Sequence, residues 1–236
     1  MIESVQILIQ HLKQTQEIAN DPCRPTISDA EFCGKLKLWR EETSTSPSGL
    51  HLGHYKVLIA RDSHPTTADE TDLTPEFIAR RDEINRKQQE IRTVRLSLIN
   101  YALERGYSYH RWQRIVNSVL FKDTDNVRLH RTRIIHIYEA DFNMAMGLKW
   151  RVAKQQAEDF HLLNEGQYGS RIGRSAIEPV YIEEMQCEIS RATRKPLILT
   201  NYDASSCYDR IIPNLGMIAS RKYGVPAQVA KATAET

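Results

Sequence analysis

Two aspartates near the end of the sequence are the first candidates for chemistry. They lie in PLILTNYDASSCYDRII, residues 196–212, where Asp203 follows an apolar run and Asp209 follows an aromatic residue. A run such as residues 197–199 is typical of a strand covered on both faces, and open α/β sheets place their sites at the carboxyl ends of strands. A carboxylate there suits Mg²⁺, which prefers oxygen ligands. We therefore expect Asp203 to be a metal ligand at the end of a buried strand, and Asp209 to lie in the first turn of the next helix.

A glycine-rich segment upstream combines backbone freedom with positive charge. It reads NEGQYGSRIGRSA, residues 164–176, and precedes an expected helix at about residues 175–191. Glycine lets a backbone approach a phosphate or a nucleic-acid strand closely, and a helix N-terminus adds N–H donors. The polar and basic side chains among its glycines are Gln167, Arg171 and Arg174. Taken alone, a glycine-rich turn that caps the helix would also explain the segment.

The most basic part of the chain lies between residues 105 and 133. Two apolar runs, at residues 115–121 and 134–138, flank the turn-like KDTDN, which predicts either a hairpin or a helix followed by a strand. In a strand, alternation places Arg133 on one face at the strand's entrance, where its guanidinium is free to meet a phosphate, and Lys122 adds a point charge. A solvated basic edge strand is the alternative.

The segment SPSGLHLGHYK, residues 46–56, resembles the HIGH signature of class I aminoacyl-tRNA synthetases. That resemblance implies that His51 and His54 contact the phosphates of ATP. No compact β-branched run precedes the segment, however, and no KMSKS-like loop follows it. A Pro-Gly turn entering a helix, with His51 and His54 as ordinary polar residues, is the interpretation that the context favours.

The remaining elements are expected to be helices that build the core. Ser28 is a predicted N-cap with Glu31 as its capping-box partner, and Thr74 followed by Pro75 opens a long charged helix. The apolar stripe of that helix is expected to comprise Ile78, Ile84, Ile91, Leu96, Ile99 and Leu103. A further helix, within residues 139–163, is expected to bury one face made by Phe142, Met146, Trp150, Ala153 and Ala157.

Composition sets the limits of these expectations. The 236 residues are 41% hydrophobic and 26% charged, which is typical of a globular chain, and the net charge of +2 does not by itself argue for nucleic acid. The four cysteines are far apart, so neither a disulfide framework nor a cysteine-based zinc site is expected. With no recognisable signal peptide or membrane span, we expect an intracellular protein, nuclear or cytoplasmic.

Three segments in fixed order resemble a known family. RIIHIYEADF, QYGSRIGRS and YDASSCYDRI are similar to successive motifs in the fingers and the start of the palm of reverse transcriptases, particularly those of non-LTR retrotransposons and group II introns. Ile134 stands where the family usually has proline, and Ser170 and Ile172 replace aromatic and proline positions. Such polymerases often have a Ser/Pro/Gly-rich segment ahead of the fingers, which gives residues 46–56 a second explanation.

The resemblance implies a fold and a function. The fold is helix-rich α+β, with a helical N-terminal extension at residues 1–105 and an incomplete right-hand polymerase, fingers and beginning of the palm, at residues 106–236. The function is that of an RNA-directed DNA polymerase with an RNA template, a DNA primer and deoxynucleoside triphosphates as partners and Mg²⁺ as cofactor.

The same resemblance assigns roles to single residues. Asp203 and the backbone carbonyl of Ala204 would bind Mg²⁺, and Tyr208 would stack under the incoming sugar and exclude a 2′-hydroxyl. The triphosphate would be held by Lys122 and Arg133. The template and the nascent pair would be lined by Gln167, Gly169, Arg171 and Arg174.

The family completes its metal site with a Y/F-x-D-D turn, and this sequence has no two adjacent aspartates. One carboxylate holds two Mg²⁺ ions poorly. We therefore expect a reverse-transcriptase fragment that is inactive as given, from a shortened gene model or a decayed element. A non-catalytic RNA- or DNA-binding remnant is the alternative, and a synthetase-type ligase is a further one.

Overall fold

The computed structural model describes residues 6–7, 10, 23–40, 47–50, 52–60, 74–122, 132–203 and 211–236. In these ranges the chain is helix-rich with one small sheet, so the expected α+β class is confirmed at this level. None of the described helices is both long and apolar enough to cross a membrane. The elements in chain order are α2 (Asp29–Leu38), α3 (Leu52–Lys56), α4 (Pro75–Arg105), β1 (Val116–Phe121), β2 (Thr132–Ile137), α5 (Ala140–Asp159), α6 (Ile177–Thr193), α7 (Pro213–Ser220), the 3₁₀ helix η5 (Arg221–Tyr223) and α8 (Ala227–Ala234).

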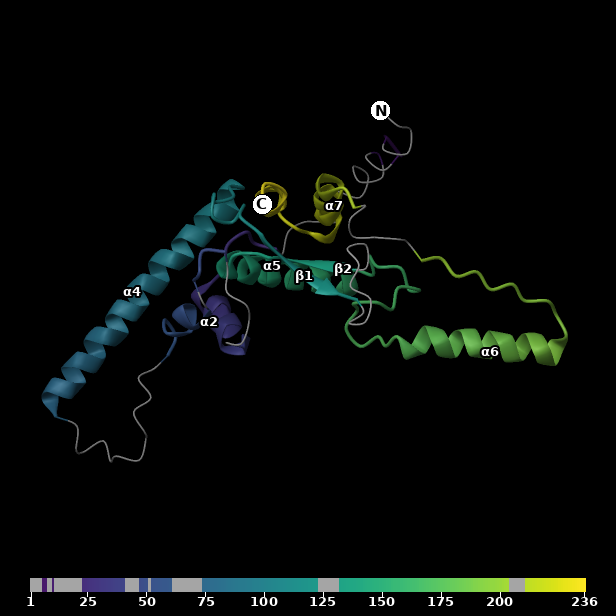
Figure 1. Ribbon diagram of the computed structural model, residues 1–236, viewed down its shortest axis with the longest axis horizontal. Coiled ribbons are helices and arrows are strands. Elements are labelled where there is room, and N and C mark those ends of the chain that lie inside the picture. Colours follow the sequence, from purple (N-terminus) through teal and green to yellow (C-terminus); the bar gives the residue numbers. More distant parts are fainter. Residues whose placement is uncertain are drawn as a thin grey trace.

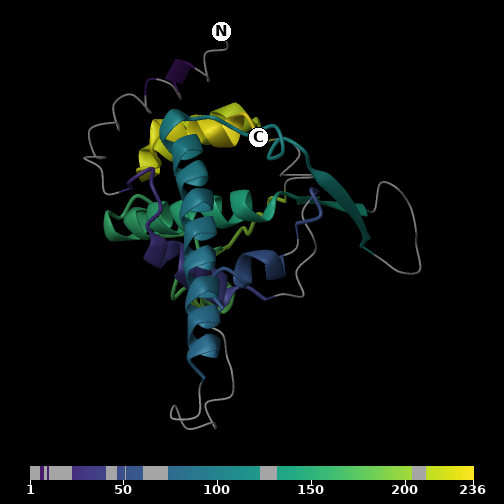
Figure 2. The ribbon, with the colours of Figure 1, turned by 90° about the vertical axis from the view of Figure 1, so that its left-hand side faces the viewer.

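One hydrophobic core joins elements from both ends of the chain. The helix α4 contacts α2, α5 and α8, and Figure 2 shows α8 crossing the upper end of α4 while α5 lies behind its middle. We call the following parts the body: residues 23–38, which include α2; the C-terminal part of α4 with the chain that follows it to residue 112; α5 with its N-cap Glu139; and α8. Its largest buried side chains include Phe32, Leu36, Ile99, Leu103 and Trp112.

Local signals set the helix boundaries as the sequence predicts. Ser28 caps α2 by accepting from Glu31 N–H, and Glu31 reciprocates at the backbone of Ser28, which confirms the capping box. The N-cap of α4 is Thr74, with Pro75 following it at the helix start. This helix ends at Gly106 with φ of 63°, where a Cβ would lie 3.1 Å from the carbonyl oxygen of Gln228 just inside α8. Glycine therefore permits both the left-handed cap and the close approach of α8.

The predicted apolar stripe of α4 is only half buried. Leu96, Ile99 and Leu103 lie in the core, whereas the side chains nearer the N-terminus, from Ile78 to Ile91, are exposed. Figure 1 shows the reason, because α4 runs well past the body and no helix or strand that the structure describes lies beside its first turns. By contrast, the face expected for α5 is confirmed: Phe142, Met146, Ala153 and Ala157 are buried and Trp150 is half-buried.

The two strands form an antiparallel hairpin, which settles the choice that the sequence left open. Val116 pairs with Ile137 at its base, and Leu120 pairs with Arg133 toward its far end. Alternation places Arg133, Ile135 and Ile137 on one face as predicted.

The segment that contains α6 lies apart from the body (Figure 1). The helix matches the prediction closely, but none of its residues is buried. Arg194 ends the helix in a left-handed conformation, and residues 195–203 then run extended without forming a strand, with Ile198 86% exposed. The expectation of a buried strand at residues 197–199 is therefore wrong for this structure. A strand covered on both faces needs paired neighbours and packed layers, and the described residues place none beside this segment.

Candidate nucleic-acid interface

The hairpin presents two of the predicted nucleotide-binding cations at one end. Arg133 lies near the start of β2 and Lys122 directly follows β1, and both side chains are exposed. Among the described residues, neither has an ion-pair partner. Both positive charges are therefore available to an anion that approaches this end of the hairpin.

The hairpin also exposes apolar side chains on both of its faces. Val116, Leu120 and Ile135 belong to one face and are about half exposed, and Val119 and Ile134 on the other face are equally open. An exposed hairpin of this kind, rich in β-branched residues and bearing terminal cations, is suited to contact a partner by shape as well as by charge.

In the glycine-rich segment, Arg171 holds the protein's own chain. Its guanidinium donates to both carboxylate oxygens of Glu158 at the end of α5, at distances of 2.7 to 3.1 Å, and to the carbonyl oxygen of Asn164 at 3.0 Å. The hydrogen bonds from Arg171 lower the pKa of Glu158, and Glu158 in turn raises the pKa of Arg171. Arg171, which was predicted to line the template, therefore attaches the glycine-rich segment to α5.

The other predicted template residues in this segment are more open. Arg174 is exposed, with its guanidinium 5.5 Å from the centre of the Tyr168 ring and Nη1 3.7 Å from Glu178. Gln167 is exposed, and a Cβ on Gly169 would meet no atom within 4 Å. The backbone at Gly169 is therefore accessible to a strand or a phosphate.

Asp203 is exposed at the end of the extended segment, beside Tyr202, which is 93% exposed. Residues 204–210, which include the predicted sites Ala204 and Tyr208 as well as Asp209, lie outside the described residues. In the part of the chain that the structure describes, no three His, Cys, Asp or Glu side chains gather as a metal site. A single exposed carboxylate does not fit a two-Mg²⁺ centre.

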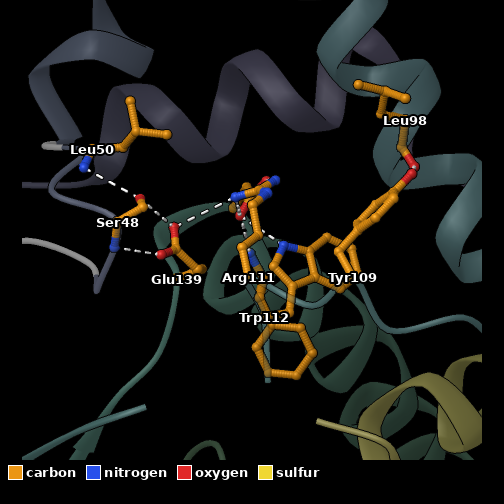
Figure 3. A network of polar contacts seen from close by, with 9 residues as sticks. Ser48, Leu50, Leu98, Tyr109, Arg111, Trp112 and Glu139 are labelled. Atoms are coloured by element: carbon orange, nitrogen blue, oxygen red, sulfur yellow. Dashed lines mark hydrogen bonds and ion pairs between the residues drawn. The ribbon is translucent and has the colours of Figure 1, made fainter. Parts of the chain in front are cut away.

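A network of buried charges supports the hairpin and was not expected from the sequence (Figure 3). Glu139, between β2 and α5, is fully buried, and Asp141, in the first turn of α5, is nearly so. Arg111 bridges them: Nη1 donates to Glu139 Oε2 at 3.4 Å and to Asp141 Oδ1 at 2.9 Å, and Nη2 pairs with Asp141 Oδ2. Trp112 Nε1–H also donates to Asp141, at 2.9 Å. The carboxylates fix the direction in which the chain leaves the hairpin for α5.

The same network anchors the turn that precedes α3. The backbone N–H and the hydroxyl of Ser48 donate to the two oxygens of Glu139, at 2.7 and 2.9 Å. Nearby, burial raises the pKa of Tyr55 to about 12, and the negative charge of Asp141 acts in the same direction. Ser48 lies in the Ser/Pro/Gly-rich segment, so this segment is tied to the base of the hairpin.

Lys149 is a further buried charged residue, and it links α5 to the chain that precedes α2. Lys149 on α5 donates from Nζ to the backbone carbonyls of Arg24, at 2.8 Å, and of Thr26. Burial lowers the pKa of Lys149, although Cys23 and Glu31 act in the opposite direction. Two weak sequence signals could have indicated these buried charges. Lys149 is a charged residue inside an otherwise apolar helical face, and Glu139 is a charged residue between a strand and a helix.

The HIGH-like segment has the conformation that its context favours. Residues 47–48 form a turn, and α3 follows with Leu52 and Tyr55 buried and His54 exposed. His51 lies outside the described residues.

No protein-family model, curated protein or solved structure matches the chain. The residues of this chain and their geometry are therefore the basis for a proposed function.

Proposed function

We propose that the chain is the fingers and the beginning of the palm of a reverse transcriptase, and that it contacts an RNA template and a DNA primer. The observation that carries this proposal is the order of three motifs, RIIHIYEADF, QYGSRIGRS and YDASSCYDRI. The described geometry supports it at the first motif, where Arg133 and Lys122 stand exposed on an apolar hairpin.

Phosphate contacts would supply most of the affinity. Arg133 offers a planar pair of donors and Lys122 a point charge, and both suit the backbone of a nucleic acid or a triphosphate. The accessible backbone at Gly169 and the guanidinium of Arg174 add a second contact area. Sequence would then be read by base pairing, and the protein would recognise backbone and shape.

Nucleotidyl transfer belongs, in this proposal, to a parent enzyme with a complete metal site. This chain offers Asp203 but no adjacent pair of aspartates. We expect the purified 236-residue chain to bind nucleic acid without extending a primer. Robust extension would show that a complete site exists and would overturn the expectation of an inactive, binding-only chain.

Salt dependence tests the hairpin contact. Arg133→Ala should weaken binding to single-stranded RNA, and the slope of log K against log salt should become shallower by about 0.7 for each lost phosphate contact. Lys122→Ala should act in the same direction. The matched control is Arg86→Ala, which removes an exposed arginine of α4 that pairs with Glu90. Equal slopes for all three variants, or binding that ignores salt, would contradict the proposal.

The role of Arg171 can be separated from a direct contact. Arg171→Ala removes the guanidinium, whereas Glu158→Gln removes the ion pair with α5 and keeps the guanidinium, which still donates to the carbonyl oxygen of Asn164. If Arg171 acts by holding the segment, both variants should weaken RNA binding to a similar extent. If it contacts the template directly, Glu158→Gln should bind as well as or better than the unmodified chain.

A further inference from the structure

A pocket of about 270 Å³ lies between α5, the glycine-rich segment and η5. Its apolar lining is formed by Trp150, Ala153, Ala157, Leu163 and Tyr223. Both aromatic side chains are half-buried, so each packs against the core while it also lines the cavity. This volume lies just below the usual range of small-molecule sites, about 300–1,000 Å³, and therefore suits a group the size of one ring system.

The polar part of the lining is small and chemically mixed. It consists of Lys154 from α5 and of Gln167 and Ser170 from the glycine-rich segment. A lysine offers one positive charge, an amide offers both a donor and an acceptor, and a hydroxyl offers either. Few polar groups around an apolar interior are typical of a small-molecule site, in which the polar groups fix the orientation of the ligand.

The wall contributed by the glycine-rich segment is held in place. Arg171 pins it to Glu158 on α5, which is the helix that forms the opposite wall. Ser170, which faces the pocket, has φ of 60°, a left-handed conformation that is uncommon for residues other than glycine. Backbone strain of this kind persists only where the surroundings enforce it, and it clusters at binding sites. The pocket is therefore preformed.

A buried amide lies on the η5 side of the pocket, outside its lining. Gln156 is 7% exposed, and its Nε2 has no hydrogen-bond partner among the described residues. A Cβ on Gly224, next to Tyr223 of the lining, would overlap the other amide atom of Gln156, Oε1. The amide is thus packed tightly against the backbone of the pocket wall while a donor is left unsatisfied, which is unusual for a buried polar group.

We propose that this pocket binds the base of a phosphate-bearing nucleotide. The ring would stack against Trp150 and Tyr223, Gln167 would hydrogen-bond the base edge, and Lys154 would meet the phosphate. This proposal rests on the proposed function, which supplies the two ligands that could carry such a base. One is an unpaired residue of an RNA strand, and the other is a free nucleotide.

Ligand-observed saturation-transfer NMR on the full 236-residue chain tests this pocket. The probes are adenosine monophosphate, adenosine and a short unstructured oligoribonucleotide. We expect transfer to the adenine protons of the monophosphate and weaker binding of adenosine. Lys154→Gln should abolish the difference between these two probes, whereas Arg151→Gln, which changes an exposed neighbour on α5 outside the pocket, should preserve it.

Substitutions at the lining locate the ligand. Trp150→Ala should weaken binding of the monophosphate by about tenfold, the effect of losing one base-aromatic stack. Trp150 also packs against the core, so Trp150→Ala can lower stability as well as binding. Two substitutions at Ser170 avoid this problem: Ser170→Phe should fill the pocket and abolish binding, and Ser170→Gly should retain binding. Binding that survives Ser170→Phe, or a non-planar apolar probe that binds as well as the monophosphate, would overturn the proposal.

The outcomes distinguish this pocket from the hairpin. Transfer to the oligoribonucleotide alone that is reduced by Ser170→Phe would assign the pocket to an RNA base, and transfer to the monophosphate that is lost in Ser170→Phe would assign it to a free nucleotide; either result supports the proposal. Absence of transfer to adenosine monophosphate, together with salt-dependent transfer to the oligoribonucleotide that Ser170→Phe leaves unchanged, would refute the pocket and leave the proposed function standing. Binding of the monophosphate without any RNA binding would do the reverse.

Discussion

The body and the segment around α6 use the same kinds of residue with opposite results. In the body, leucines, isoleucines and a tryptophan are buried, and even Glu139 and Asp141 are withdrawn from water because Arg111, Ser48 and Trp112 satisfy them. In the arm, which we define as α6 and residues 194–203, no residue is buried although isoleucine, leucine and tyrosine recur. An amphipathic pattern therefore specifies a helix, but not what the helix packs against.

The largest expected contrast between the two regions comes from truncating one apolar side chain in each. Leu36→Ala removes a fully buried side chain of the body and should lower the free energy of unfolding by about 2–5 kcal/mol. Ile189→Ala removes an arm side chain that is 58% exposed and should change it by less than about 0.5 kcal/mol. Urea unfolding followed by circular dichroism measures both, and an equal cost at Ile189 would show that the arm packs in solution.

A slightly smaller effect is expected when the buried charges lose their partner. Arg111→Met leaves Glu139 and Asp141 without the guanidinium that joins them. We expect a loss of about 3 kcal/mol, at the low end for a broken buried ion pair, because Arg111 itself is 37% exposed. The exposed Arg114 provides the control, since Arg114→Met should be nearly neutral. If both variants unfold at the same urea concentration, the network does not stabilise the body.

The capping box of α2 should contribute less again. Ser28→Ala removes the side chain that accepts from Glu31 N–H and should cost about 1 kcal/mol. Ser175→Ala is the comparison near the arm, where the hydroxyl of Ser175 accepts from Ile177 N–H but no body element depends on the helix. Its cost in global unfolding should be close to zero, and a loss equal to that of Ser28→Ala would contradict the separation of the two regions.

The smallest expected effect concerns pH and is confined to the join between the body and the arm. Arg171 lowers the pKa of Glu158 from 4.5, so the folded state binds this proton more weakly than the unfolded state. The stabilisation from this pair is complete above pH 4.5 and is lost as the pH falls through the lower, folded pKa. Amide NMR signals of Gly166 and Gly169 should then shift in that range, and Glu158→Gln should remove the dependence. Unchanged titration in this variant would mean that another group is responsible.

Features that depend on neighbours in the sequence were predictable. Ser28 with Glu31, Thr74 with Pro75, the alternation around Arg133 and the buried face of α5 all express local preferences of the backbone and of amphipathic patterns, and the structure has each of them. These signals operate over a few residues, so the absence of a matching protein does not weaken them.

Features that depend on distant partners were not predictable. The exposure of Ile78 and Ile91 follows from where the body stops along α4, and the exposure of residues 197–199 follows from the lack of neighbouring strands in the described part of the chain. Arg171 was expected to line the template because its type and position suit phosphate, but its carboxylate partner lies outside the motif, on α5. Burial of Glu139 likewise requires Ser48, which lies 91 residues earlier in the chain.

The packing of α8 against α4 has a consequence for how the molecule is made. Val229, Ala230 and Ala232 complete the core, and Ser108 is hydrogen-bonded to Thr236 across 128 positions of the sequence. Contacts between such distant positions are expected to form late in folding, because closing the long intervening loop costs conformational entropy before the contact can stabilise the protein. During synthesis, α4 and α5 emerge from the ribosome well before the residues that cover them. The apolar faces of α4 and α5 therefore stay exposed while the arm is being translated, and this is the period in which a chaperone can bind them.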